Sequence, residues 1–94
     1  MGFEYRLTFR SPTRSLLDDL LRSCRGFERF DADRQIYILD SRSEREPGGM
    51  PQLELKIEPF GLYACDYGSG RELLLAVQRE LEGRFGTVSL ADLE

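Results

Sequence analysis

The feature that most constrains the fold of this chain is a pair of alternating segments joined by a turn too short to cross over a sheet. Leu53, Leu55 and Ile57 alternate with charged residues, and a second apolar segment, residues 62–67, follows the turn Pro59-Phe60-Gly61. Alternation with a period of two predicts half-buried strands, and strands joined by a tight turn pair as an antiparallel hairpin. The chain is therefore expected to build an antiparallel sheet.

Other parts of the chain supply further strands. Residues 3–9 alternate between apolar and polar side chains, which predicts another half-buried strand. Residues 27–39 are typical of a second hairpin, with its turn at Asp31-Ala32-Asp33. A short closing strand over residues 87–90 is kept as an option.

Two segments have the period of an amphipathic helix. Ser11 suits an N-cap and Pro12 the first helical position. The apolar face of this first helix, with Leu21 at its margin, consists of Thr13, Leu16, Leu17, Leu20 and Cys24. Gly26 is expected to end it. A second helix is predicted from about Arg71 to about Gly83, and its core face consists of Leu73, Leu74, Val77 and Leu81.

Together these elements predict an α+β fold built as a two-layer sandwich. We expect a mainly antiparallel sheet of four to five strands with two helices on one face, in the order β-α-β-β-β-β-α, the short final strand being left open. The length of 94 residues suits one small domain, so residues 1–94 are treated as a single domain. The polar segment 41–51 is expected to be a flexible loop, and residues 91–94 could form a frayed tail.

Charge and hydropathy narrow the choice of partners. The N-terminal strand pattern contains charges, so no signal peptide is expected, and no apolar run reaches the ~18 residues of a membrane span. We therefore expect a soluble cytoplasmic protein without a membrane partner. The formal net charge is −4, and the acidic excess lies in residues 48–94. A protein that binds the phosphate backbone usually has a basic surplus, so nucleic acid is not favoured.

The sequence offers few candidates for catalysis or metal binding. The chain has no histidine, which removes the usual general base and the commonest metal ligand. Cys24 and Cys65 lack metal-type spacing, and we expect both to be free thiols buried on the core side of their elements. We predict no catalytic residue, no metal site and no cofactor.

Acidic side chains are the remaining candidates for acid–base chemistry. Glu54, Lys56 and Glu58 should lie on one strand face, which is typical of a solvated sheet surface. A carboxylate pair formed by Glu54 or Glu58 with Asp66 remains open. We nevertheless expect a protein without enzymatic activity.

The glycine-rich segment Gly68-Ser69-Gly70-Arg71 precedes the second helix. A helix N-terminus offers free amides and a positive dipole end, which suit an anion, and Arg71 could add a charged contact. However, Ser69 and Glu72 also have the spacing of a capping box, which would use the same donors. The sequence favours the capping box and keeps the anion site as an alternative.

Two surfaces are candidates for contact with a partner. On the second helix Leu75 falls opposite the core face, so we expect an exposed leucine among charged residues: Arg71, Glu72, Arg79 and Glu82. The uncovered face of the sheet should mix aromatic and charged side chains: Arg6, Tyr37 or Ile38, Glu54, Lys56, Glu58, and Tyr63 or Tyr67.

The sequence therefore favours a small non-enzymatic interaction module that binds a protein partner or a second copy of itself. An inhibitor or immunity-type protein is one version, motivated by the acidic C-terminal half. The alternative is a domain that binds a small molecule or anion through the Gly68–Arg71 loop. A third and weaker hypothesis is an enzyme that works through carboxylates and arginine alone.

Overall fold

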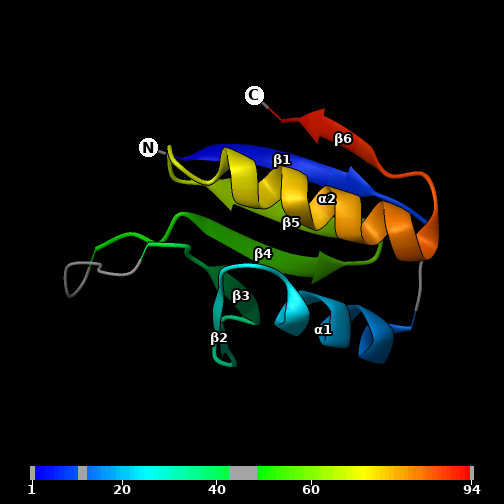
Figure 1. The fold of residues 1–94 in the computed structure, drawn as a ribbon, viewed down its shortest axis with the longest axis horizontal. Coiled ribbons are helices and arrows are strands. Elements are labelled where there is room, and N and C mark those ends of the chain that lie inside the picture. Colours follow the sequence, from blue (N-terminus) through cyan, green and yellow to red (C-terminus); the bar gives the residue numbers. More distant parts are fainter. Residues whose placement is uncertain (1, 11–12, 43–48, 94) are drawn as a thin grey trace.

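The computed structural model describes residues 2–10, 13–42 and 49–93 and contains two helices and a six-stranded sheet (Figure 1). In chain order the elements are β1 (Phe3–Thr8), α1 (Arg14–Ser23), β2 (Phe27–Asp31), β3 (Ile36–Leu39), β4 (Leu53–Glu58), β5 (Gly61–Asp66), α2 (Arg71–Phe85) and β6 (Ser89–Asp92). The strands lie in the order β2-β3-β4-β5-β1-β6, and all neighbours are antiparallel.

This architecture confirms the predicted class and the order of the elements. The sheet has six strands instead of the four to five expected, because the optional closing segment does form a strand. That strand, β6, pairs with β1 over residues Ser89 to Asp92 and covers its outer edge. Residues 91 and 92, part of the expected frayed tail, therefore lie in a strand, while Glu94 lies outside the described residues.

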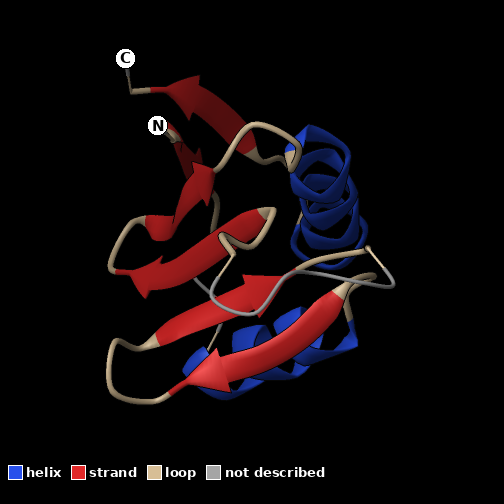
Figure 2. Ribbon diagram, turned by 90° about the vertical axis from the view of Figure 1, so that its left-hand side faces the viewer, coloured by secondary structure: helices blue, strands red, loops and turns tan. Residues whose placement is uncertain are grey.

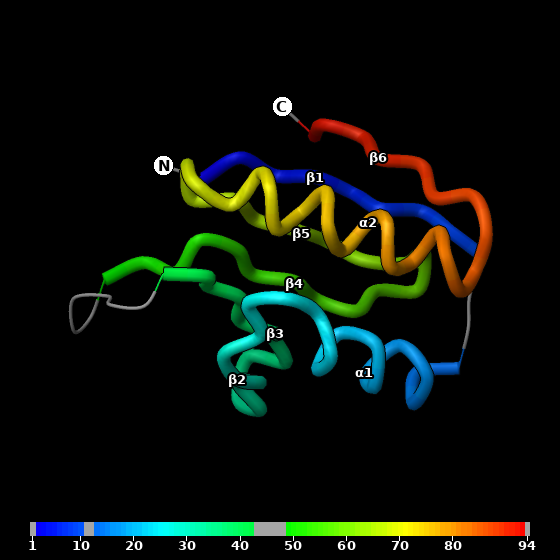
Figure 3. The backbone as a smooth tube through the Cα atoms, viewed as in Figure 1, coloured from blue at the N-terminus to red at the C-terminus, as the bar shows by residue number. Residues whose placement is uncertain are grey.

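Both helices lie on one face of the sheet, as Figure 2 shows. The tube in Figure 3 follows α2 along β5 and β1, whereas α1 contacts β2. Between the two layers lies one apolar core, which includes the fully buried side chains Leu7, Leu20, Leu39, Leu55, Leu62, Leu74 and Leu81. The opposite side of the sheet, which no helix covers, is called the open face below.

The apolar stripe of α1 differs from the predicted one. Leu17, Leu20 and Leu21 are buried, whereas Leu16 is 54% exposed, so Leu16 and Leu21 exchange their expected roles. Leu17, Leu20, Leu21 and Cys24 form an i, i+3, i+4, i+7 stripe, which is the spacing that faces a core. The N-cap is Thr13, whose Oγ1 accepts a hydrogen bond from the amide of Leu16. The predicted Ser11 and Pro12 lie outside the described residues.

The second helix, α2, has the predicted core face and is two residues longer than predicted. Leu73, Leu74, Val77 and Leu81 are all buried. The helix ends at Phe85, and its C-cap is Gly86, whose φ of +89° lies in the left-handed region that favours glycine. Within the described part of the chain, neither helix is long and apolar enough to cross a membrane.

The predicted loop 41–51 is described only at its ends, because residues 43–48 lie outside the described residues. At one end the guanidinium of Arg42 pairs with the carboxylate of Asp40 at 2.7 Å. At the other end the Gln52 side chain accepts hydrogen bonds from the backbone amide and the hydroxyl of Ser41. The Ser41–Gln52 hydrogen bonds connect the segment that follows β3 with the residue that precedes β4.

Candidate functional site

The loop before α2 is built around a buried carboxylate. Asp66, which is 4% exposed, accepts hydrogen bonds through Oδ1 from the amides of Gly68 and Gly70, both at 2.8 Å. Gly70 is the N-cap of α2, and it has no side-chain cap. The predicted capping box of Ser69 and Glu72 is therefore wrong. With Gly70 as N-cap, the third helical position is Leu73, so Glu72 is not in capping register.

The same loop fastens three elements to one another. The side-chain amide of Gln52, just before β4, donates to the carbonyl of Ser69 at 3.2 Å. Arg71 donates to the hydroxyl of Tyr5 at 3.2 Å, and its guanidinium lies 5.7 Å from the centre of that ring. Two amides and the arginine predicted to bind an anion are thus engaged within the protein.

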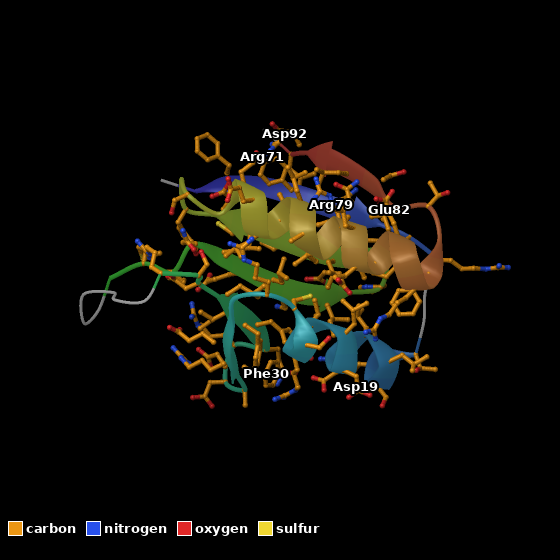
Figure 4. The ribbon with its side chains drawn as sticks, in the orientation of Figure 1. Asp19, Phe30, Arg71, Arg79, Glu82 and Asp92 are labelled. Atoms are coloured by element: carbon orange, nitrogen blue, oxygen red, sulfur yellow. The ribbon has the colours of Figure 1, made fainter. Side chains whose placement is uncertain are left out.

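The predicted helix surface contains a hollow of about 260 Å³, which is lined by Arg25, Glu72, Leu75, Ala76 and Arg79. Leu75 is half-buried, so the prediction of an exposed leucine is wrong. The helical wheel considers α2 alone and places Leu75 opposite the core face of that helix. In the structure, Arg25 in the turn after α1 lies beside Leu75. Arg71 and Glu82 lie elsewhere along α2, as Figure 4 shows.

The open face carries a row of side chains that crosses the sheet from β2 to β1. The register pairs Arg29 with Ile38, Ile38 with Glu54, Glu54 with Cys65, and Cys65 with Glu4. The sequence did not decide whether Tyr37 or Ile38 lies on the open face. In the structure Ile38 lies on this face and Tyr37 lies in the core. The expectation that Cys65 faces the core is wrong, because its neighbours across the sheet are the open-face glutamates.

Tyr63 and Tyr67 both lie on the open face, on either side of Cys65. The hydroxyl of Tyr63 hydrogen-bonds to the carboxylate of Glu4. The hydroxyl of Tyr67 donates to Glu54 Oε1 at 2.6 Å. Burial and these hydrogen bonds raise the pKa of both phenols well above the usual value, so both remain protonated donors at neutral pH. The two rings are therefore held in fixed positions.

Glu54 is the central acidic residue of this face. It is only 8% exposed, so the prediction of a solvated carboxylate at this position is wrong. Tyr67 donates to one of its oxygens, and the guanidinium of Arg34 donates to the other at 3.2 Å. Arg34 also donates to Asp31 at 2.9 Å. Because a buried carboxylate requires hydrogen-bond partners, these contacts explain how Glu54 is tolerated here.

Two hollows open beside Glu54. The smaller, about 60 Å³, is called the dimple and is lined by Ile36, Glu54, Leu55, Lys56, Tyr63 and Cys65. The larger, about 280 Å³, is called the Arg29 pocket and is lined by Arg29, Arg34, Ile38, Gly49, Met50, Pro51 and Glu54. Burial raises the pKa of the Cys65 thiol, which therefore stays protonated in the dimple at neutral pH.

The carboxylate pair left open by the sequence does not form between Glu54 and Asp66. Glu54 lies on the open face, whereas Asp66 follows the core residues Leu62 and Ala64 on the helix side of β5. Among residues 2–10, 13–42 and 49–93, no group of three Cys, Asp or Glu side chains could hold a metal ion. Both cysteines are free thiols, and burial raises the pKa of Cys24 to about 11.

Sequence reasoning missed five residues of the Arg29 pocket that the structure brings together. They come from a strand, a turn and a polar loop, and none of them carries a motif: Arg29, Arg34, Gly49, Met50 and Pro51. Residues 27–31 do not alternate strictly, because Phe27 and Phe30 are three residues apart, and the structure has a register shift between Phe27 and Arg29. The face on which Arg29 lies is therefore fixed by pairing with β3.

Comparison with known proteins adds no further constraint. No protein-family model, no curated protein and no solved structure matches this chain.

Proposed function

We propose that this chain is a small non-enzymatic module that binds another protein through the open face of its sheet. One observation carries the proposal: Tyr63 and Tyr67 are held by Glu4 and Glu54 on the open face, and Tyr63 and Glu54 line the dimple between them. Tyrosine is enriched at protein interfaces because its ring supplies apolar area and its hydroxyl a hydrogen bond. Side chains that are already fixed lose less conformational entropy on binding.

The partner suited to this face presents an apolar side chain surrounded by charges of both signs. The dimple accepts a small aliphatic group between Ile36 and Tyr63. Around it Glu4 and Glu58 alternate with Arg6 and Lys56 on neighbouring strands. Such a mixed surface favours a protein over a polyanion, and it gives no preference for the strongly basic target of an inhibitor or immunity-type protein.

The two alternative sites predicted from the sequence receive less support. The hollow around Leu75 lies on the helix side of the molecule, so a partner on the open face would not contact it. In the Gly68–Arg71 loop, the Gly68 and Gly70 amides already donate to Asp66. An anion there would have to displace a buried carboxylate from both amides.

Affinity capture with matched variants tests the proposal. Wild type, Tyr63→Ala and Leu75→Ala are immobilised after circular dichroism has shown that each is folded. A captured protein is then purified and its Kd for each variant measured. We expect Tyr63→Ala to weaken binding at least about tenfold, as truncation of an interface tyrosine commonly does, and Leu75→Ala to leave binding unchanged.

The same variants separate the outcomes. A dimer in light scattering that Tyr63→Ala dissociates would identify the partner as a second copy of the chain. Loss of binding in Leu75→Ala with full binding in Tyr63→Ala would move the interface to the helix side. A strict monomer that captures no partner would count against a protein-binding function.

A further inference from the structure

The Arg29 pocket is a built site at one end of the open face, separate from the dimple. Its floor is the row Arg29–Ile38–Glu54, three residues paired across β2, β3 and β4. Neighbouring strands lie about 4.8 Å apart, so the Cα atoms of Arg29 and Glu54 are separated by about 10 Å, with Ile38 between them. Met50 and Pro51 supply the wall on the loop side.

Among the charged residues that line this pocket, Arg29 alone has no opposite partner within the described part of the chain. The carboxylate of Glu54 accepts from Tyr67 and Arg34, and Arg34 also pairs with Asp31. Arg29, by contrast, makes no side-chain hydrogen bond or ion pair with any residue in 2–10, 13–42 or 49–93. The guanidinium of Arg29 is therefore the group that a ligand would neutralise.

The rest of the lining is apolar and includes an exposed methionine. Ile38 is 2% exposed and forms the floor, although it does not belong to the core between the layers. Met50 is 57% exposed beside it. A methionine side chain is flexible and polarizable, so it adapts to the shape of an apolar ligand. The volume of about 280 Å³ lies near the lower end of the range for small-molecule sites.

We propose that the Arg29 pocket binds a small monocarboxylate with a short aliphatic tail. The guanidinium of Arg29 receives the carboxylate in a two-point contact, the geometry that arginine and carboxylate favour. The tail lies above the floor residue Ile38 and packs against the exposed side chain of Met50. The charges of Glu54 and Arg34 compensate each other in the same lining, so Arg29 offers one unpaired positive charge, which matches a monocarboxylate better than phosphate. This site does not depend on the protein-binding proposal.

A methyl NMR titration of the full chain tests this site with isovalerate as the probe. The chain has two methionines, and its isoleucines are Ile36, Ile38 and Ile57, so the signals of Met50 and Ile38 can be assigned by substitution. We expect isovalerate to shift both signals saturably. Acetate, which lacks the tail, should bind several-fold more weakly, and inorganic phosphate should give no saturable shift.

Matched arginine variants separate the pocket from general charge effects. Arg29→Gln should weaken isovalerate binding at least tenfold, and Arg29→Lys should retain part of it. Arg79→Gln should bind as wild type does, because Arg79 is an exposed arginine on α2, on the other side of the sheet. Equal binding by Arg29→Gln and wild type, saturable binding of phosphate as tight as that of isovalerate, or no saturable shift of Met50 and Ile38 would each overturn the proposal.

Discussion

Single tyrosines on both sides of the sheet have their hydroxyls fixed by carboxylates. In the core, Tyr37 is 1% exposed and bonds to Asp18 of α1; burial and then this bond raise the pKa of Tyr37 to about 12. Tyr63 and Tyr67 make the equivalent bond on the open face. Tyrosine–carboxylate hydrogen bonds therefore fix side chains both in the core and on the proposed interface, which supports a binding surface with fixed side chains.

Asp40 gives a prediction about pH at the scale of one residue. Its carboxylate accepts from the guanidinium and amide of Arg42 and from the amide of Gln52. The Arg42 hydrogen bond, the largest cause, holds the pKa of Asp40 well below its usual value. A carboxyl whose pKa is lower in the folded state stabilises the fold above its unfolded pKa of about 3.9, and this stabilisation is lost as the pH falls through the folded pKa.

Asp40→Asn should therefore lower the free energy of unfolding at pH 7 by about 1 kcal/mol, because Arg42 is partly exposed and its ion pair is screened. The difference from wild type should stay constant down to about pH 4 and shrink below it. Urea unfolding of both proteins from pH 7 to pH 2.5 measures this. A difference that grows as the pH falls below 4 would contradict the assignment.

At the scale of one element, the N-cap and the interior of α2 each have a glycine, and the two have opposite requirements. A Cβ on Gly70, the N-cap, would lie 2.2 Å from the carbonyl oxygen of Gln52, so the backbone just before β4 would have to move. A Cβ on Gly83, within the helix, would meet nothing within 4 Å. The close approach of two backbones thus requires glycine at position 70 and not at position 83.

The same substitution at the two positions should have opposite effects. Gly70→Ala should lower stability by about 1–3 kcal/mol through overpacking. Gly83→Ala should raise it by about 0.5–1 kcal/mol, because alanine favours the helix more than glycine does. Thermal unfolding followed by circular dichroism gives both changes. Destabilisation by both substitutions to the same extent would show that the contact with Gln52 is not the cause.

The sequence predicted elements better than it predicted the contacts between them. Alternation and turn residues depend on the local chain, so the order of strands and helices and the core face of α2 were predictable. The stripe of α1 was misplaced, because a short helix with adjacent leucines allows two phases, and packing selected Leu21 over Leu16. The cap of α2 was also misassigned, because the carboxylate that binds its amides comes from Asp66, before the loop.

The candidate sites were less predictable for the same reason. That Tyr63 and Tyr67 lie on the open face follows from alternation along β5. The Arg29 pocket, however, requires the register of β2 on β3 and of β3 on β4, and the irregularity near Glu28 changes the face that follows it. The hydrophobic pattern and the turn usually set the register of a hairpin, but the irregularity in β2 is not marked by the pattern of residues 27–31.

At the scale of the whole molecule, the central strand β5 is expected to resist local opening more than the edge strand β6. β5 pairs along all six of its residues with β1 on one side and β4 on the other. β6 is an edge strand that pairs with β1 alone, over four residues. Leu62 and Ala64 of β5 are fully buried, whereas Ser89, Ala91 and Asp92 of β6 are exposed. Local opening therefore requires far less disruption at β6 than at β5.

Amide hydrogen exchange measured by NMR should reproduce this gradient. We expect the protected amides of β5 to exchange only through global unfolding, so their free energies of exchange should equal the free energy of unfolding from urea titration. Protected amides of β6, and that of Leu93 directly after it, which donates to the carbonyl of Glu4, should exchange through local fraying at lower free energies. Protection of β6 as high as that of β5 would mean that the closing strand is part of the cooperative core. In that case, removal of residues 87–94 should unfold the whole sheet instead of exposing the edge of β1.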